Sequence, residues 1–213
     1  MDMRDQILRI PNMISDEDCD KLIREYEARN SEAKTEKCLH ANTGLDTTST
    51  YLKVDLKPIS YTYNLIFNKT EYMINQWMEK LQQYNSFHLP SLRTVYLKCS
   101  HKYRLMKYQP GGWIHPHIDG NPFIYASCTF QLNDEFTGGE FWFWNGKYKI
   151  RLNKGDGLIF PSGPFWVHEV TNIETGSRYS VNSFILSCGP KLHQHSDDIM
   201  LSSLEDVRTY NIK

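Results

Sequence analysis

The 213-residue sequence has no long apolar run. Nowhere do about 18 consecutive apolar residues occur, which is the length that a membrane-spanning helix requires. The first residues, Met1 to Asp5, also lack the basic stretch and apolar segment of a secretion signal. We therefore expect a soluble, cytoplasmic protein with no membrane partner.

The sequence also lacks an excess of charge of either sign. It has 24 Lys and Arg residues against 25 Asp and Glu residues, which leaves a net charge of −1. This balance provides no general basic field that would attract phosphate groups. We therefore expect no nucleic acid partner.

Cysteine is scarce, and its spacing matches no structural framework. The cysteines are odd in number and include no Cys-x-x-Cys pair: Cys19, Cys38, Cys99, Cys128 and Cys188. This argues against a disulfide framework and against a cysteine-based zinc site. We expect buried free thiols.

Two segments near the N-terminus show helical periodicity. The first begins with a capping sequence at Ser15, and its apolar residues recur at helical spacing as far as about Asn30. The second has Pro58 in its first turn and an apolar stripe that ends near Tyr84. Each helix is expected to cover a sheet with its apolar face.

The rest of the chain is rich in aromatic residues and favours strands. From residue 93 onward, short aromatic or β-branched runs are separated by Gly, Pro, Asn and Asp. The predicted strands are Arg93–Lys98, Tyr103–Tyr108, Ile114–Ile118, Ile124–Leu132, Glu140–Trp144, Tyr148–Leu152, Gly157–Phe160, Phe165–Val170 and Arg178–Leu186. Because no helices separate these strands, a parallel sheet is excluded. The pattern predicts an α+β fold that is mainly β, with a core that is a β-sandwich or a double-stranded β-helix (jelly roll) buttressed by N-terminal helices.

We predict a single domain that spans residues 1–213. Within it, residues 1–90 form a helical support and a loop, residues 91–188 form the jelly-roll core, and residues 189–213 form a C-terminal tail. The polar segment 31–57 predicts a long loop with a short strand near its end.

A candidate metal site begins with His117 and Asp119. On an extended strand, side chains two residues apart project to the same face, so both could reach one ion. Two histidines and one carboxylate on one side of an ion are the ligands of non-haem Fe(II) oxygenases. The second histidine could be His101, His115 or His168. Three ligands from one strand would span about 13 Å, which is too far for bonds near 2 Å and disfavours His115.

His168 is the best candidate because it lies in an aromatic and β-branched run that is typical of an interior strand. Arg178 follows ten residues later, at the start of the last predicted strand. Its guanidinium is suited to a bidentate pair with a carboxylate, and Ser180 on the same face could donate to the same carboxylate. The tail histidines His193 and His195 are expected to be exposed to solvent.

These residues resemble a known pattern. The sequence is similar to the Fe(II)/2-oxoglutarate-dependent dioxygenase superfamily, and most of all to its prolyl 4-hydroxylase-like branch. The matching positions, in order, are Tyr108, Gly111, His117, Asp119, the run Gly138-Gly139-Glu140, His168 and Arg178. The resemblance covers roughly residues 97–186.

The resemblance implies a site and a set of cofactors. His117, Asp119 and His168 would hold Fe(II), and O2 would be the oxidant. The cosubstrate 2-oxoglutarate would contact Arg178, Ser180, Tyr108, Thr129 and Gln131, and ascorbate is a further candidate cofactor. The products would be a hydroxylated substrate, succinate and CO2.

Three positions depart from the branch. Ile114 stands where a Tyr often precedes the first metal histidine, and Gln131 stands where a Tyr commonly reaches the cosubstrate. Arg178 replaces the Lys of several prolyl hydroxylases.

The leading hypothesis for the substrate is a prolyl residue in a peptide or protein. Trp113, in the loop that enters the metal strand, is the first candidate for a substrate contact, followed by Tyr125 and Trp166. A free amino acid or another small metabolite is the alternative substrate, and a pocket closed by the 31–57 segment would favour it. A non-catalytic β-sandwich binding module is the alternative from another class. The oligomeric state is not predicted.

Overall fold

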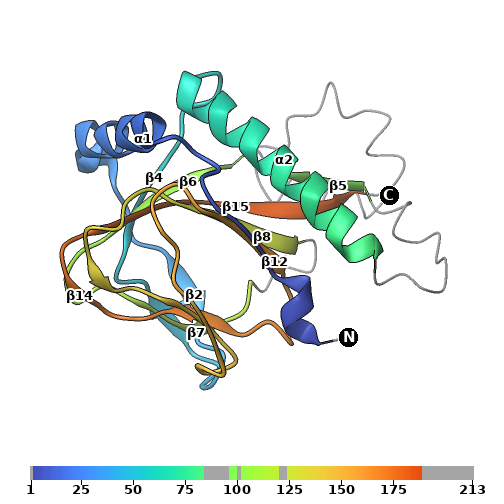
Figure 1. Ribbon diagram of the computed structural model, residues 1–213. Helices are drawn as coiled ribbons and strands as arrows, with labels where there is room; N and C mark the ends of the chain where they lie inside the picture. The colour runs from blue at the N-terminus through green and yellow to red at the C-terminus, as the bar shows by residue number, and fades with distance from the viewer. Residues whose placement is uncertain (1, 84–95, 100–101, 120–123, 189–213) are drawn as a thin grey trace, which may run out of the picture.

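Two β-sheets face each other, and two helices cover the outer face of the larger sheet (Figure 1). The computed structural model describes residues 2–83, 96–99, 102–119 and 124–188. The predicted tail with His193 and His195, and also His101, lie outside these residues. Within them, no helix has both the length and the apolar character needed to cross a membrane.

Both predicted helices form, and serine side chains cap them. Helix α1 (Asp16–Ala28) begins where Ser15 accepts a hydrogen bond from the backbone of Asp18. Helix α2 (Tyr61–Gln82) begins after Ser60, which caps it in the same way. The predicted start at Pro58 is wrong by three residues, because the chain turns at Ile59 with φ at 67°.

The larger sheet contains the predicted central strands in antiparallel order. Its order is β1 (Leu8–Ile10), β12 (Gly157–Pro161), β8 (Ile124–Gln131), β15 (Arg178–Cys188), β6 (Arg104–Tyr108) and β4 (Leu52–Asp55), with β5 (Tyr96–Cys99) also paired to β15. Strand β15 pairs with three strands, β5, β6 and β8, and therefore joins the two halves of this sheet.

The smaller sheet carries the histidines. Its order is β11 (Tyr148–Ile150), β10 (Phe141–Phe143), β13 (His168–Val170) and β7 (Ile114–His117). Two short antiparallel pairs complete the structure: β14 (Ile173–Thr175) with β9 (Thr137–Gly138), and β2 (Lys37–Leu39) with β3 (Asp46–Thr48). Two facing antiparallel sheets with helices on one side confirm the predicted jelly-roll fold.

Some elements differ from the sequence prediction. The segment 31–57 contains the β2–β3 hairpin as well as the expected strand β4. The two hairpin strands have three residues each, which is too short for apolar alternation to mark them in the sequence. Strand β13 starts at His168 rather than Phe165, because Phe165 is exposed and Trp166 closes a turn onto Gly163.

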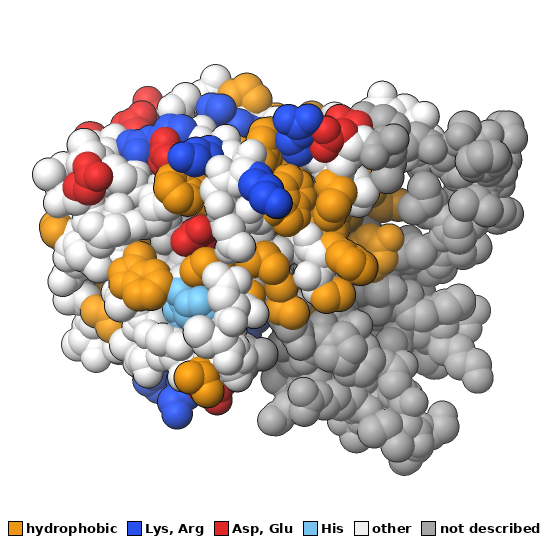
Figure 2. All heavy atoms as spheres, turned by 90° about the horizontal axis from the view of Figure 1, so that it is seen from below, with side chains coloured by type: hydrophobic (Ala, Val, Ile, Leu, Met, Phe, Trp, Pro, Cys, Tyr) orange, Lys and Arg blue, Asp and Glu red, His pale blue; other side chains and the backbone are white. Residues whose placement is uncertain are grey.

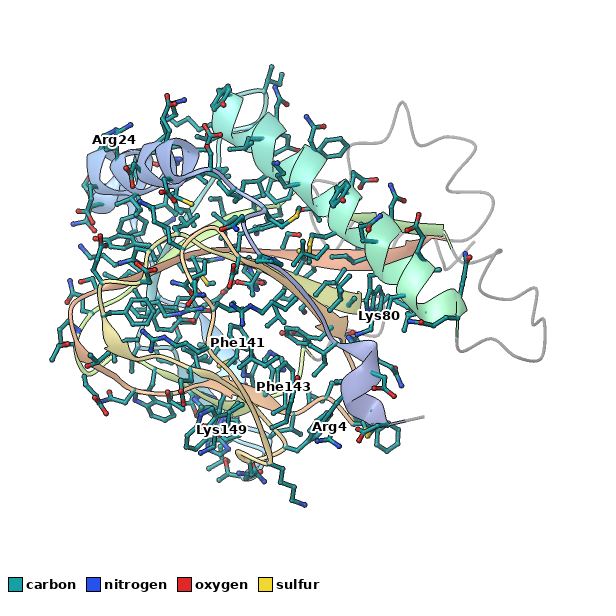
Figure 3. The ribbon with its side chains drawn as sticks, in the orientation of Figure 1. Arg4, Arg24, Lys80, Phe141, Phe143 and Lys149 are labelled. Atoms are coloured by element: carbon teal, nitrogen blue, oxygen red, sulfur yellow. The ribbon has the colours of Figure 1, made fainter. Side chains whose placement is uncertain are left out.

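Two apolar clusters hold the layers together. One lies between the helices and the larger sheet and contains Leu22, Trp77 and Phe130. The other lies between the sheets, where Phe143 packs edge-to-face on Phe160 with ring centroids 5.0 Å apart (Figure 3). Cys19 and Cys128 are buried, as predicted, and Cys38 is half-buried.

Candidate active site

Strand pairing brings the two predicted metal histidines together. His117 is the last residue of β7 and His168 is the first residue of β13, and the antiparallel register places them opposite each other. Their ring centroids are 4.2 Å apart. Asp119 lies beyond the end of β7 rather than on it, so the chain bends its carboxylate back toward the imidazoles.

The hydrogen bonds of the two imidazoles determine which ring nitrogen is left to face Asp119. Nδ1 of His117 lies 3.0 Å from the carbonyl oxygen of His115, and Nδ1 of His168 lies 2.9 Å from that of Trp166. A carbonyl oxygen can only accept, so each Nδ1 carries the proton. The lone pair is then on Nε2 of both rings, which suits metal binding.

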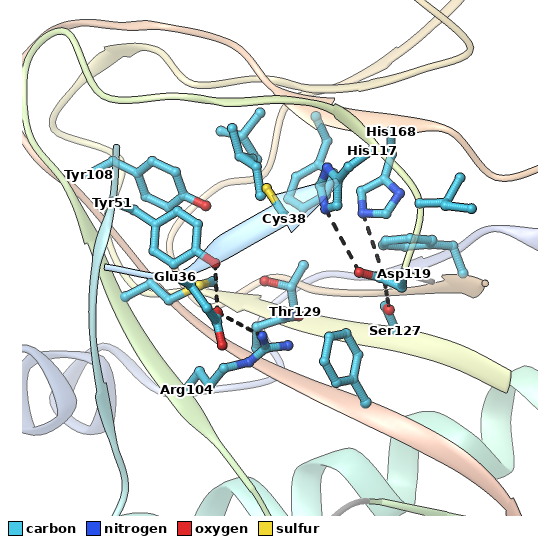
Figure 4. A pocket seen from close by; sticks show the side chains of 18 of the residues that line it. Glu36, Cys38, Tyr51, Arg104, Tyr108, His117, Asp119, Ser127, Thr129 and His168 are labelled. Atoms are coloured by element: carbon cyan, nitrogen blue, oxygen red, sulfur yellow. Dashed lines mark hydrogen bonds and ion pairs between the residues drawn. The ribbon is translucent and has the colours of Figure 1, made fainter. Parts of the chain in front are cut away.

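Asp119 completes the group. Its Oδ1 lies 3.8 Å from Nε2 of His117, and its Oδ2 lies 3.6 Å from Nε2 of His168 (Figure 4). The hydroxyl of Ser127 donates a hydrogen bond to Oδ2. Burial raises the pKa of Asp119, but the two imidazoles and Ser127 outweigh it, so the pKa lies below its usual value. Burial and the neighbouring His168 lower the pKa of His117.

This donor set fits a divalent iron ion. The ligand atoms of His117, Asp119 and His168 all lie within 4.8 Å of one another. Bonds near 2 Å allow two donors of one ion to be at most about 4 Å apart, and both carboxylate–imidazole distances meet this limit. The role of the three residues as ligands stays a prediction. His115 does not join them, because its Nε2 faces the sulfur of Cys38 at 3.3 Å.

The three residues line a cavity of about 380 Å³ between the sheets (Figure 4). One part of its wall is apolar and includes Ile114, Phe141, Phe160 and Val170. The other part is polar and includes Glu36, Arg104 and Arg178. A cavity of this size can hold a small organic molecule beside the ion.

Arg178 supplies a buried positive charge at the cavity wall. It is 1% exposed, its Nη1 donates to Ser180 at 3.1 Å, and its Nε has no hydrogen-bond partner. Among the described residues, no carboxylate forms an ion pair with it. A buried guanidinium without a counter-ion is costly, so this wall is suited to an anionic ligand. The observation fits the carboxylate of 2-oxoglutarate.

The other predicted cosubstrate residues divide into two groups. Tyr108 and Thr129 line the cavity, and Ser180 supports Arg178 from outside the lining. Gln131 does not line it, because its amide donates to the carbonyl oxygens of Asn133 and Tyr179. The Gln131 side chain therefore links two backbone segments, and this position is at odds with a cosubstrate contact.

None of the three predicted substrate residues lines the cavity. Tyr125 packs edge-to-face on Trp77 of α2, because an irregularity in the β8–β15 pairing leaves it as an extra residue and reverses the alternation. Trp166 is buried against Trp144, with ring centroids 5.5 Å apart. These two predictions are at odds with the structure, whereas Trp113 is 37% exposed at the entry to β7.

Sequence reasoning missed an ionic network in the polar wall. The carboxylate of Glu36 accepts hydrogen bonds from the Tyr51 hydroxyl at 2.8 Å, from Lys53 at 2.6 Å and from Arg104 at 3.0 Å. Burial raises the pKa of Glu36, but Arg104 and the other donors outweigh it and bring the pKa to about 2. Only Arg104, a charge within an apolar strand pattern, carried a signal in the sequence.

Comparisons with known proteins agree with this geometry. A family model described as the 2OG-Fe(II) oxygenase superfamily matches residues 103–186. A viral collagen prolyl hydroxylase from Paramecium Bursaria Chlorella virus-1 is similar in structure, with a TM-score of 0.62, 18% identity and coverage of 86% of this chain and 96% of that one. No curated protein matches the sequence.

Two further solved structures share the fold. A Pseudomonas putida prolyl-4-hydroxylase has a TM-score of 0.60 and 16% identity, over 86% of this chain and 94% of that chain. A Trichoplax adhaerens prolyl hydroxylase, solved in complex with a hypoxia inducible factor peptide, has a TM-score of 0.60 and 13% identity, over 86% of this chain and 84% of that chain.

The family match includes His117, Asp119, His168 and Arg178. It argues against the alternative of a non-catalytic binding module. Similarity to this family implies Fe(II), 2-oxoglutarate and O2 as the reactants that the site would hold. The chain is therefore similar to the 2OG-Fe(II) oxygenase superfamily over residues 103–186, and its fold is similar to that of solved prolyl hydroxylases.

Proposed function

We propose that this protein hydroxylates a C–H bond of a prolyl residue in a peptide or protein. The observation that carries the proposal is the buried group of His117, Asp119 and His168 beside Arg178, which has no counter-ion among the residues that the structure describes. When bound, Fe(II) and 2-oxoglutarate supply the oxidation: one oxygen atom of O2 enters the substrate as hydroxyl, the other enters succinate, and CO2 leaves.

The residues of the chain have distinct tasks in this proposal. His117, Asp119 and His168 would hold the ion from one side, which leaves its other positions to the reactants. Arg178, fixed by Ser180, would bind the far carboxylate of 2-oxoglutarate. The apolar wall would exclude water from the substrate C–H bond.

The prolyl substrate is supported by the fold and by exposed apolar groups. The solved structures with this fold include proteins described as prolyl hydroxylases, one of them bound to a peptide fragment. Three large apolar side chains stay exposed: Leu45 between β2 and β3, Trp113 before β7 and Phe165 before β13. On the face seen from below, hydrophobic side chains gather around a histidine (Figure 2). Such a surface is suited to an extended peptide.

A free amino acid or small metabolite is the second candidate. It is favoured by one observation: Glu36, Cys38 and Tyr51 of the 31–57 segment form part of the cavity wall. A cavity covered in this way suits a small substrate better than a long peptide.

The test is succinate formation from 2-oxoglutarate in air with Fe(II). We expect turnover by the wild type, loss of turnover and of iron binding in His117→Ala, and retained iron binding in His115→Ala as the matched control. A wild type without turnover or iron binding would contradict the proposal. Stimulation by free proline and not by proline-containing peptides would favour the second candidate.

Two finer predictions concern ascorbate and the location of the protein. A stimulation of turnover by ascorbate would support it as a cofactor, and cell fractionation would test the cytoplasmic location.

A further inference from the structure

The cavity contains a second arginine, Arg104, that the proposed reaction does not yet use. Arg104 lies on β6 and is 9% exposed, and its side chain lines the cavity together with Asn182 and Phe184. The group is held rigidly: its guanidinium lies over the ring of Phe184 at 4.0 Å from the centroid, and Nη1 donates to Glu36 at 3.0 Å. A fixed guanidinium at a cavity wall is suited to bind a carboxylate.

Strand register places Arg104 between the two ends of the expected cosubstrate. Tyr108 of β6 pairs with Arg178, whereas Arg104 pairs with Asn182, four residues further along β15. Asn182 in turn pairs with Thr129 of β8, and Ser127, two residues from Thr129, donates to Asp119.

The level of Arg104 therefore lies between the Arg178 end and the metal end of the cavity. In Figure 4, the guanidinium is drawn beside Glu36, on the side toward Asp119. A dicarboxylate that extended from Arg178 to the ion would have its second carboxylate near the metal, and its chain would lie alongside Arg104.

Glu36 does not exhaust the binding capacity of Arg104. The guanidinium has five N–H donors, and its contacts are Nη1 to Glu36 and, in the amide orientation that satisfies both groups, Nη2 to the oxygen of Asn182 at 3.3 Å. Glu36 also receives Lys53 and the Tyr51 hydroxyl, so its negative charge is shared among three donors. The pair therefore keeps donors and positive charge available to a ligand.

We propose that Arg104 is a second carboxylate-binding residue of the cavity, which holds the C1 carboxylate of 2-oxoglutarate beside the metal. This inference rests on the proposed function, because it takes 2-oxoglutarate as the ligand. It assigns the two carboxylates of one molecule to two arginines on neighbouring strands, Arg178 on β15 and Arg104 on β6.

The test uses the full chain loaded with Mn(II), which supports binding without turnover, and isothermal titration calorimetry. We expect Arg104→Gln to weaken 2-oxoglutarate binding by about tenfold to a hundredfold, as the loss of a hydrogen bond to a charged group predicts. Arg104→Lys, which keeps the charge without the planar pair of donors, is expected to bind with intermediate affinity. Arg178→Gln is the comparison variant.

Two shortened ligands separate a specific contact from a damaged cavity. The acid 2-oxobutyrate lacks the C5 carboxylate, so Arg104→Gln weakens it and Arg178→Gln does not. The acid 4-oxopentanoate lacks the C1 carboxylate, so the pattern reverses. An Arg104→Gln variant that binds 2-oxoglutarate within about twofold of the wild type overturns the inference. An equal loss for all three ligands also overturns it, because it indicates a collapsed cavity.

The outcomes also separate this inference from the proposed function. If Mn(II)-loaded wild type does not bind 2-oxoglutarate, the proposed function fails and the inference falls with it. If the wild type binds and Arg178→Gln weakens binding while Arg104→Gln does not, the proposed function stands and only the role of Arg104 is refuted.

Discussion

Replacing Glu36 by Gln tests how much the ionic network of Glu36 with Lys53 and Arg104 stabilises the folded protein. The pKa of Glu36 falls from 4.5 to about 2 in the folded protein. At 1.36 kcal/mol per pKa unit, this corresponds to about 3 kcal/mol of stabilisation by the charged form. The side chain is 28% exposed, so solvent screening lowers the value. We expect Glu36→Gln to lose about 2 kcal/mol of unfolding free energy at pH 7.

The loss has a defined pH dependence. Because the folded pKa lies below the unfolded value, the stabilisation is fully present above about pH 4.5 and disappears as the pH falls toward 2. The difference between wild type and Glu36→Gln should therefore be constant from pH 6 to 8 and shrink below about pH 4.5.

Urea denaturation at a series of pH values measures this difference directly. In thermal unfolding at pH 7, about 2 kcal/mol corresponds to a shift of roughly 4–8 °C for a chain of this length. Glu32→Gln is the matched control, because Glu32 pairs with Arg29 on the surface with its side chain 51% exposed. It should change stability by less than about 0.5 kcal/mol. A Glu36→Gln variant as stable as this control at pH 7, or a difference that persists unchanged at pH 3, would refute the reasoning.

Three further substitutions test the metal group and the framework. Ser127→Ala removes the donor to Asp119 and should weaken Mn(II) binding by about 10- to 100-fold in a calorimetric titration. Gly138→Ala should destabilise the protein by more than about 1 kcal/mol in denaturant unfolding, since Gly138 has φ at 74° and an added Cβ would lie 2.0 Å from the oxygen of Asn172. Phe143→Ala should cost about 3–5 kcal/mol, because the ring is fully buried between the sheets.

For each of these three variants, one result would contradict the prediction. Unchanged Mn(II) affinity in Ser127→Ala would show that the hydroxyl does not orient the carboxylate. A Gly138→Ala variant of wild-type stability would contradict the close approach of β9 to residue 172. A loss below about 1 kcal/mol for Phe143→Ala would mean that the layer between the sheets can collapse around the space left by the ring.

The sequence determined the fold class and singled out the candidate metal and cosubstrate residues. Aromatic and β-branched runs without intervening helices predicted the antiparallel sheets, because alternation of side chains is a local property of each strand. His117, Asp119, His168 and Arg178 stood out because few side chains bind metals or carboxylates, and the spacing of these four matched a known pattern.

Only the tertiary structure decided which residues complete the cavity. Ser127 reaches Asp119 and Arg104 reaches Glu36 through pairings between distant segments, and a sequence does not show such pairings. An irregularity of one residue in β8 turned Tyr125 away from the site. Side-chain direction reverses with each residue of register, so a local pattern predicts that a strand forms but not which side chains meet across the sheets.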